Sequence, residues 1–369
     1  MELGFYLFVA FCIMALIQLI YYLGVFSRVF KKVTSPAPSK QPVSVIICSR
    51  NNREYLEENL PSILSQNHPS FEVIVVNDGS TDGTIDYLDN LSKENEQLNV
   101  LHLDIDERYH RGKKFAQTIG IKAAKHELMV FTDADCKPSS NEWLTLMVSS
   151  FTQDKSIVLG VGNYKRKASF TNWIIQLETF HSLLLYINFA LAKLPYMGVG
   201  RNLAYRKPLF FSVKGFASHQ HLLSGDDDLF VNETATKDNT TVCLNPNAFT
   251  ESEPKKSVGQ WMKQKRRHFS TGKMYKKKHR ILLALYSFSL FFYYVLGVLG
   301  ILDASYLIPI LSIVGFRFVV QGIVLYKNMK MFNFLSYFWV FPFLDLGILL
   351  IHIFIGIRGY FSKPLRWNY

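Results

Sequence analysis

A chain of 369 residues is long enough for one complete α/β domain and several membrane-crossing helices. Of these residues 49% are apolar and 15% aromatic, and the excess gathers at the two ends of the chain, which argues against an ordinary soluble enzyme. The net charge of +12 is also uneven, because Lys255–Arg280 contains Lys and Arg but no Asp or Glu. Since that segment adjoins an apolar stretch, we expect it to contact anionic lipid headgroups.

The cysteines show neither metal-ligand spacing nor a disulfide framework. A chain of this length does not need disulfides for stability, so we expect reduced thiols and a cytosolic environment for its central part. The four residues are Cys12, Cys48, Cys136 and Cys243.

The first apolar stretch, residues 3–26, is long enough to cross the hydrocarbon core of a bilayer. A cleaved signal peptide would carry its basic residues in front, whereas here Glu2 precedes the stretch and Arg28, Lys31 and Lys32 follow it. We therefore expect a retained membrane anchor over 1–27. The positive-inside rule then places the following domain in the cytoplasm.

A Pro- and Ser-rich linker is expected over residues 28–42, and after it the pattern changes to alternating strands and helices. Short, almost continuous apolar runs are typical of strands that are buried on both faces of a parallel sheet. They occur at 43–48, 72–77, 99–104 and 127–132, and segments with helical spacing lie between them at 54–66, 82–95 and 112–125. The sequence thus predicts an open, mostly parallel α/β sheet within a catalytic domain over 43–280, with ligands at the carboxyl ends of the strands.

The stretch 170–194 is strongly apolar but is interrupted by polar residues such as Glu178 and His181. We expect a helix along the membrane interface rather than a span, and an ordinary core helix is the alternative. Three further apolar stretches near 281–301, 304–325 and 334–357 predict C-terminal membrane segments over 281–357, followed by a tail at 358–369. Pro342 and Asp345 interrupt the last stretch, which indicates a broken or re-entrant element.

Acidic residues follow two of the predicted strands. Asp78 lies in an Asp-Gly-Ser-Thr-Asp turn, which suits a ribose or base contact, although a helix-capping turn has the same composition. Asp133 and Asp135 follow the fourth strand, and two carboxylates beside a diphosphate suit Mg²⁺ or Mn²⁺. A solvated acidic turn is the alternative there. The first strand ends in Cys-Ser-Arg-Asn-Asn without a GxGxxG pattern, and Gly112-Lys113 has no preceding GxxxxG, so neither a dinucleotide site nor a P-loop is indicated.

These motifs, in this order, resemble those of the family-2 inverting glycosyltransferases of the GT-A fold. The resemblance rests on NDGSTD at 77–82, FTDADC at 131–136, Arg111-Gly112-Lys113, GDDD at 225–228 and Gln264-x-x-Arg267-His268, and it covers roughly residues 43–270. His268 stands where Trp is usual, which puts the identity of the acceptor in doubt. The segment Gly198–Asn202 is similar to the family's acceptor-site lining, although a plain backbone turn fits it nearly as well.

The resemblance implies a role for each motif. Asp227 is the expected catalytic base with Asp226 as the alternative register, and Asp135 with Asp133 is the expected site for Mg²⁺ or Mn²⁺. Arg267 is expected to contact the departing diphosphate. The residues implied to bind the nucleotide sugar are Arg50, Asp78, Lys113, Asp133, Gln264, Arg267 and His268.

We therefore expect an integral protein of the inner or plasma membrane, with a cytoplasmic catalytic domain that transfers a sugar from a UDP-sugar to a lipid or a lipid-linked glycan. A processive polysaccharide synthase of the same family usually has more spans than these four stretches supply. A non-catalytic membrane scaffold is disfavoured because the acids of all three acidic motifs are intact. Nucleic acid is not an expected partner, because the basic segment lacks interleaved aromatic residues.

Overall fold

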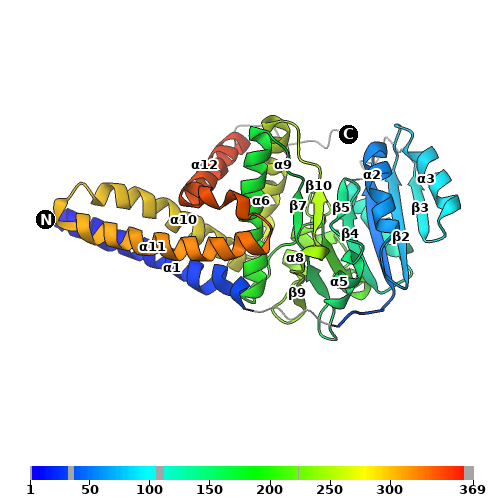
Figure 1. The fold of residues 1–369 in the computed structure, drawn as a ribbon, viewed down its shortest axis with the longest axis horizontal. Helices are drawn as coiled ribbons and strands as arrows, with labels where there is room; N and C mark the ends of the chain where they lie inside the picture. The colour runs from blue at the N-terminus through cyan, green and yellow to red at the C-terminus, as the bar shows by residue number, and fades with distance from the viewer. Residues whose placement is uncertain (1, 32–36, 105–111, 223, 361–369) are drawn as a thin grey trace.

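The computed structural model describes residues 2–31, 37–104, 112–222 and 224–360. An α/β domain occupies one end of the molecule and a bundle of long helices the other (Figure 1). Some of the sequence predictions fall outside the described residues. They concern Lys32, part of the expected linker, Arg111 and the tail beyond residue 360.

The main sheet has seven strands in the order β3-β2-β1-β4-β8-β6-β9. The predicted strands are confirmed as four neighbours that run parallel, whereas β8 is antiparallel to both β4 and β6. The bounds are β1 Val43–Ser49, β2 Phe71–Asp78, β3 Leu98–Leu103, β4 Leu128–Asp133, β6 Ile157–Leu159, β8 Leu203–Arg206 and β9 Thr240–Val242. A second sheet joins β5 Cys136–Pro138, β10 Thr250–Ser252 and β7 Gly162–Tyr164.

Helices cover both faces of the main sheet, which explains the unbroken apolar runs of its strands. Val45 and Ile47 of β1 belong to one buried cluster, whereas Ile46 between them belongs to another. The predicted helices between the strands are confirmed. The helices of this domain are α2 Arg53–Leu64, α3 Thr84–Glu94, α4 Lys113–Ala123, α5 Trp143–Ser149, α7 Lys207–Ser212, α8 Asp228–Thr234 and α9 Val258–Thr271.

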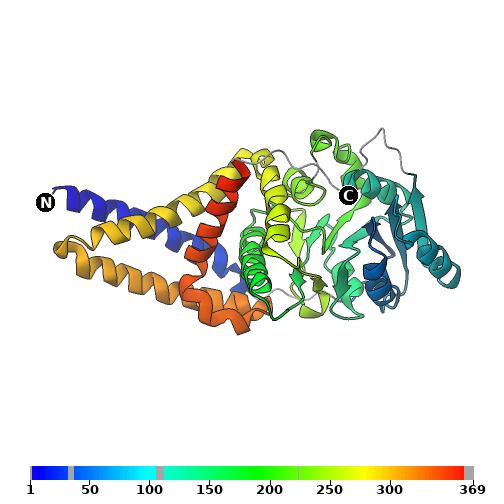
Figure 2. The same cartoon turned by 90° about the horizontal axis from the view of Figure 1, so that it is seen from above.

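Three long helices extend away from the domain and meet at a common tip (Figures 1 and 2). They are α1 Glu2–Ile20, which continues as a helical segment to Phe30, α10 Lys277–Gly300 and α11 Ala304–Met331. Each is long and apolar enough to cross a membrane. We call the end of this bundle that adjoins the domain its base.

The last apolar stretch is a broken helix. A 3-10 helix at Leu335–Val340 is followed by α12, Phe341–Tyr360, and the chain changes direction between them (Figure 2). Although residues 335–357 are apolar enough to cross a membrane, α12 packs against α6 and α9 across the base of the bundle and does not extend to the tip. The interruption expected from Pro342 and Asp345 is therefore present in the structure.

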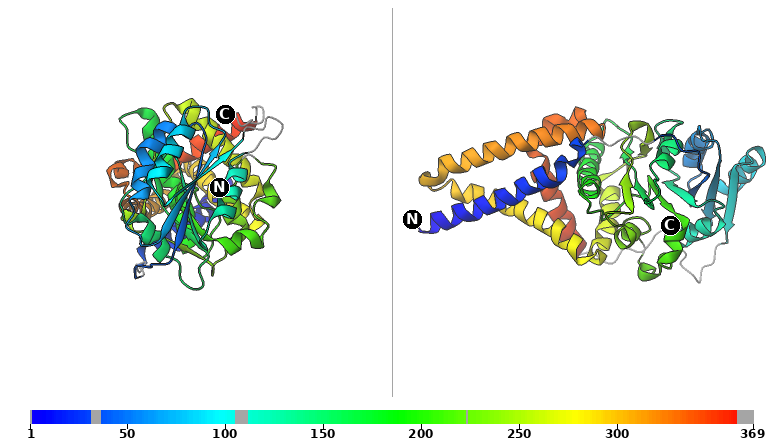
Figure 3. Two further views of the ribbon diagram at one scale, coloured as in Figure 1. Left: turned by 90° about the vertical axis from the view of Figure 1, so that its right-hand side faces the viewer. Right: turned by 90° about the horizontal axis from the view of Figure 1, so that it is seen from below.

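Helix α6, Phe170–Leu191, lies across the molecule between the bundle and the domain (Figure 3). Its apolar side chains pack in one cluster with residues of both parts, and Leu183 and Leu184 are each 1% exposed. The expectation of an interfacial helix that turns this apolar face to lipid is therefore wrong for most of α6. The polar residues within it are buried as well, since Asn172 and Gln176 both hydrogen-bond to the carbonyl of Lys165.

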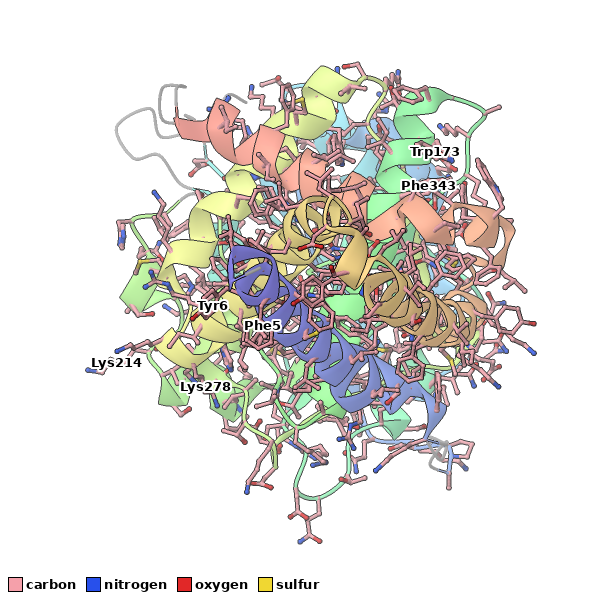
Figure 4. All side chains as sticks on the ribbon, turned by 90° about the vertical axis from the view of Figure 1, so that its left-hand side faces the viewer. Phe5, Tyr6, Trp173, Lys214, Lys278 and Phe343 are labelled. Atoms are coloured by element: carbon pink, nitrogen blue, oxygen red, sulfur yellow. The ribbon has the colours of Figure 1, made fainter. Side chains whose placement is uncertain are left out.

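The base carries aromatic and basic side chains on different sides. Seen along the bundle, Trp173 and Phe343 lie on one side of the helices and Lys278 on the other (Figure 4). Phe343 is 71% exposed, and Trp173 stacks with the ring of Trp339 at 6.4 Å between centroids. The base of the bundle thus carries exposed aromatic side chains on one side and basic ones on the other.

Candidate active site

The two strands that flank β1 both end in an acid. Because β2 and β4 pair with β1 in parallel, Asp78 and Asp133 close their strands at the same edge of the sheet. The turn after β2 is fixed by a hydrogen bond of 2.5 Å from Ser80 Oγ to Asn77 Oδ1, and Gly79 supplies the positive φ of 63° that this turn requires. Parallel pairing therefore brings acids together that are far apart in the sequence.

Lys113 joins two of the acidic motifs. Its Nζ lies 2.7 Å from Asp133 Oδ1 and 2.9 Å from Asp226 Oδ2. Burial by itself would lower the pKa of Lys113, but attraction to these carboxylates outweighs burial and raises it well above its usual value. Helix α4 begins at Lys113 and lies close against the sheet. The close approach requires a glycine at 120, because a Cβ there would lie only 2.9 Å from Ile46 Cγ2.

Asp133 and Asp135 form the most plausible metal site among the described residues. Ligand atoms of these two carboxylates and of Cys136 lie within 4.8 Å of one another. Burial and the neighbouring Asp133 raise the pKa of Asp135, which pairs with no basic residue among those described. A divalent cation would relieve this repulsion, and two carboxylates suit a hard cation. The Cys136 thiol is a soft ligand that already lies 2.9 Å from Ser252 Oγ, so it fits such an ion less well.

Each acid of the Gly225–Asp228 segment has a different partner. Asp226 pairs with Lys113, and that attraction lowers its pKa in spite of burial. Asp227 accepts a hydrogen bond of 2.7 Å from the backbone N–H of Gly200, and another from the N–H of Asp228. Burial, followed by repulsion from its two acidic neighbours, raises the pKa of Asp227 to about 7. A carboxyl with this pKa can exchange a proton at neutral pH.

The third acid ties two helices together. Asp228 accepts hydrogen bonds from Thr271 Oγ1 at 2.5 Å and from the Tyr275 hydroxyl at 2.7 Å. Thr271 is the last residue of α9 and Tyr275 lies just after it, so Asp228 holds the C-terminal end of α9 beside the start of α8. This contact explains how the segment after residue 257 is held beside the acids.

A cavity of ≈ 220 Å³ gathers most of the predicted site residues. Gln264, Arg267 and His268 of α9 reach it, and Gln264 Nε2 donates to the Tyr164 hydroxyl at 3.3 Å. Arg50 and Asp78 lie at the same edge of the sheet but do not line this cavity. The predicted residues that do line it are Lys113, Asp133, Asp135, Asp226, Asp227, Gln264, Arg267 and His268.

The cavity also has walls that the motifs did not indicate. Arg201 lies over the ring of Tyr164, with 4.2 Å between guanidinium carbon and ring centroid, and donates to the carbonyl of Asn163. Helix α6 contributes Glu178 and Ser182, and Lys265 of α9 faces them. Arg201 had a signal in the sequence, because it lies in the Gly198–Asn202 segment. Glu178 stood out as a polar residue in an apolar stretch, but nothing in the sequence connected it or Ser182 with the site.

Comparison with known proteins agrees with this geometry. Residues 44–211 match the family described as Glycosyl transferase family 2. The putative teichuronic acid biosynthesis glycosyltransferase TuaG of Bacillus subtilis is 38% identical over 98 residues, which are 27% of this chain and 37% of that protein. The poly-beta-1,6-N-acetyl-D-glucosamine synthase of Staphylococcus epidermidis is 31% identical over 119 residues, 31% of this chain and 28% of that protein. The matched stretch thus spans about a third of the length of these relatives.

One solved structure is similar over nearly the whole chain. It is the mannosyltransferase PcManGT from Pyrobaculum calidifontis in complex with GDP-Man and Mn²⁺, with a TM-score of 0.61 and 20% sequence identity over 97% of this chain and 99% of that one. The likeness includes the long helices as well as the sheet. Residues 44–211 of this chain thus match glycosyl transferase family 2, and they lie in a domain with the GT-A fold.

Proposed function

We propose that this chain is an inverting glycosyltransferase that moves a sugar from a nucleoside-diphosphate sugar, in the first instance a UDP-sugar, to a hydroxyl of a lipid-linked or membrane-proximal acceptor. The observation that supports this most directly is the cavity itself. One space contains paired carboxylates suited to a metal, a carboxyl that titrates near neutral pH, and the cationic Arg267. A family-2 domain supplies the reaction class.

The donor would lie at the carboxyl edge of the sheet. Asp78 and Arg50 stand where the nucleoside would enter, and Arg267 faces the same cavity as Asp133 and Asp135. A divalent ion held by those two aspartates would neutralise charge on the diphosphate, and the similar mannosyltransferase was solved with Mn²⁺. Arg267 and Lys113 supply fixed positive charge beside the leaving group.

Asp227 would act as the catalytic base. Its carboxylate removes the proton from the acceptor hydroxyl, and the oxygen attacks the anomeric carbon from the side opposite the diphosphate. The new glycosidic C–O bond forms as the bond to the diphosphate oxygen breaks, and that oxygen keeps the electron pair, so the configuration inverts. Such a base contributes roughly 10²–10⁴-fold to the rate.

The charge distribution of the helices supports a cytoplasmic catalytic domain. Glu2 begins α1 and Asp303 caps the start of α11, both at helix ends far from the domain, and residues 281–316 contain no Lys or Arg. The base ends of the helices are basic, with Arg28 after α1, Lys278 at the start of α10 and Lys330 at the end of α11. By the positive-inside rule, the end of the bundle that adjoins the domain, and the domain with it, would lie in the cytoplasm.

The relatives include a polymer synthase, so the number of sugars added per acceptor is a separate question. Three helices reach the tip and α12 does not, which favours transfer of one or a few sugars over translocation of a growing chain.

The experiment is a donor panel. The purified full-length chain in lipid nanodiscs is incubated with UDP- and GDP-sugars, with Mn²⁺, Mg²⁺ or EDTA, and release of nucleoside diphosphate is measured. We expect release from at least one sugar nucleotide, its loss with EDTA, and its loss in Asp227→Asn when an acceptor is required. Absence of release from every nucleotide sugar with either metal would reject the proposed function.

A further inference from the structure

The cavity extends from the catalytic acids toward the bundle. Its wall on that side consists of α6 side chains, and α6 lies between the domain and the base (Figure 3). On the same side α9 contributes Lys265, His268 and Phe269, and Phe269 is 42% exposed. Asp133 at the end of β4 and Asp135 line the cavity on the proposed donor side, whereas α6 carries none of the donor motifs, so its wall is available to the acceptor. We call Glu178, Ser182 and Lys265 the α6 subsite.

The α6 subsite contains a buried ion pair that none of the glycosyltransferase motifs includes. Glu178 is 3% exposed and forms an ion pair with Lys265, whose side chain is 13% exposed. Ser182 Oγ donates to Glu178 Oε1 at 2.9 Å. Both charged groups line the same cavity as Asp227.

A contribution to the stability of the fold does not readily explain why this ion pair is buried. Removing two charges from water costs several kcal/mol per ion, and apolar residues of similar volume usually serve a core at least as well. Apolar side chains fill other buried positions of α6, since Ile175 and Leu183 are each 1% exposed. A charged pair at the wall of a reaction cavity therefore points to a ligand.

The chemistry of the pair selects the ligand. A carboxylate accepts hydrogen bonds from hydroxyls and an ammonium donates them to hydroxyl oxygens, so neighbouring hydroxyls of a sugar ring satisfy both groups. A phosphate at this pair would be attracted by Lys265 but repelled by Glu178 beside it. The cations Lys113 and Arg267 line the same cavity, but in the proposed mechanism they serve the diphosphate of the donor. The exposed ring of Phe269 offers an apolar surface beside the polar pair, as ligand sites commonly do.

We propose that Glu178 and Lys265 bind the hydroxyls of an acceptor sugar, so that the acceptor is a lipid-linked glycan rather than a lipid phosphate. This inference rests on the proposed function and narrows it. It also accounts for the position of the α6 subsite between the helix bundle and the acids. A glycan on a membrane lipid would enter the cavity from the bundle side and present its hydroxyl to Asp227.

The test compares two acceptor probes in the full-length protein. An octyl β-glycoside series carries neutral sugar, and decyl phosphate carries only the anion. With a donor that the wild-type protein uses, we expect transfer to octyl glycosides and none to decyl phosphate. Glu178→Gln and Lys265→Met should each raise the acceptor KM roughly tenfold to a hundredfold, the loss expected for a charge-assisted hydrogen bond. The donor KM and the acceptor-independent release of nucleoside diphosphate should stay unchanged.

Two further variants separate binding from folding. The exchanged pair Glu178→Lys with Lys265→Glu keeps the ion pair, and so its thermal midpoint should stay near that of the wild type while the acceptor KM rises. Glu127→Gln removes a comparable partner from the exposed Arg206–Glu127 pair outside the cavity and should change neither KM. Transfer to decyl phosphate alone, or an unchanged acceptor KM in the exchanged pair, would overturn the inference. Failure of every nucleotide sugar with the wild-type chain would instead reject the proposed function.

Discussion

Three consecutive aspartates at 226–228 differ in chemistry because each has different neighbours. Lys113 keeps Asp226 ionised, and Thr271 and Tyr275 donate hydrogen bonds to Asp228. Asp227 lies between two acids, and its donors among the described residues are the backbone N–H groups of Gly200 and Asp228. An aspartate with a pKa of about 7 is half ionised at neutral pH, whereas an ordinary aspartate is fully ionised and a weaker base. The surroundings therefore single out Asp227 from its neighbours.

The pH dependence of activity follows from this pKa. In the proposed mechanism only ionised Asp227 accepts the acceptor's proton, so kcat/KM should rise about tenfold per pH unit below pH 7 and level off above it. Asp227→Asn should lower kcat about 10²–10⁴-fold while the affinity for the nucleotide stays close to that of the wild type. A pH series of initial rates and calorimetric titration of UDP test both statements. If Asp226→Asn abolishes turnover and Asp227→Asn does not, the register of the base is off by one.

The same group affects stability with a definite sign. The folded pKa of Asp227 lies above its usual value of 3.8, so its contribution to stability is complete below pH 3.8 and is lost as pH rises through about 7. Asp227→Asn cannot ionise, so this loss should be absent. We expect the variant to melt higher than the wild type at pH 8 and to differ less at pH 5, as measured by thermal unfolding in the same detergent. A lower midpoint for the variant at pH 8 would show that Asp227 is stabilising when ionised.

Asp135 gives the prediction for the metal. Asp135→Ala removes one of two neighbouring carboxylates, so Mn²⁺ should no longer strengthen UDP binding, while the fold is kept because Asp135 forms no ion pair with a described residue. Calorimetric titration of UDP with and without Mn²⁺ measures this effect. Asp89→Ala, which removes an exposed acid paired with His102, is the matched control. An undiminished Mn²⁺ effect in Asp135→Ala would refute the assignment.

At the scale of elements, α6 connects the two halves of the molecule. Its apolar face packs against both the bundle and the domain, so a charge introduced at Leu184 would be buried among apolar side chains. Leu184→Glu should therefore prevent folding, whereas Phe170→Glu at the 71% exposed start of the helix should fold normally. Size-exclusion chromatography of both variants tests this difference. A folded and active Leu184→Glu would restore the interfacial-helix hypothesis.

The broken last helix is held by charged and polar side chains inside the bundle. Arg317 of α11 lies 2.6 Å from Asp345 of α12, both are 3% exposed, and Gln18 of α1 and the Tyr294 hydroxyl of α10 complete the network. Four helices thus meet at one buried ion pair. Such pairs are strongly destabilising when broken but nearly neutral when both members are replaced.

This network predicts a specific pattern of stabilities. Asp345→Leu should cost about 3–5 kcal/mol because it leaves Arg317 charged and unpaired, and adding Arg317→Met should restore most of the loss. Thermal unfolding of the single and double variants in detergent measures the effect. If the double variant is as unstable as Asp345→Leu, the pair supplies a stabilisation that apolar packing cannot replace.

For the whole molecule, the charge asymmetry of the bundle predicts its orientation. Leu302→Cys at the tip, where Leu302 is 80% exposed, should react with a membrane-impermeant maleimide added to intact cells. Lys93→Cys on the exposed surface of α3 should react only after the cells are opened. Labelling of Lys93→Cys from outside would reverse the orientation and remove the cytoplasmic nucleotide sugars as donors.

Much of the molecule follows from local pattern. Hydrophobic periodicity shows whether a segment is buried on both faces, on one face or faces lipid. For this reason β1 to β4 and the long helices match their predicted ranges within a few residues. The sequence predicted Asp133 and Asp135 as metal ligands from their place after a buried strand, and the resemblance to a known family predicted Asp227 as the base.

The position of α6 and its charged pair depended on the tertiary structure. An apolar helix with scattered polar residues has the same composition whether its apolar face meets lipid or protein, so the sequence left 170–194 undecided between the membrane interface and the core. Glu178 and Lys265 are 87 positions apart (265 minus 178) and belong to no shared motif, so only the packing of α6 on α9 shows that they meet. Sequence alone determined the reaction class to expect and the strand ends where it would occur. The tertiary structure decided which side chains surround the acids. Burial and contacts between distant residues, rather than residue type, determine the protonation state of each group and which groups it can contact.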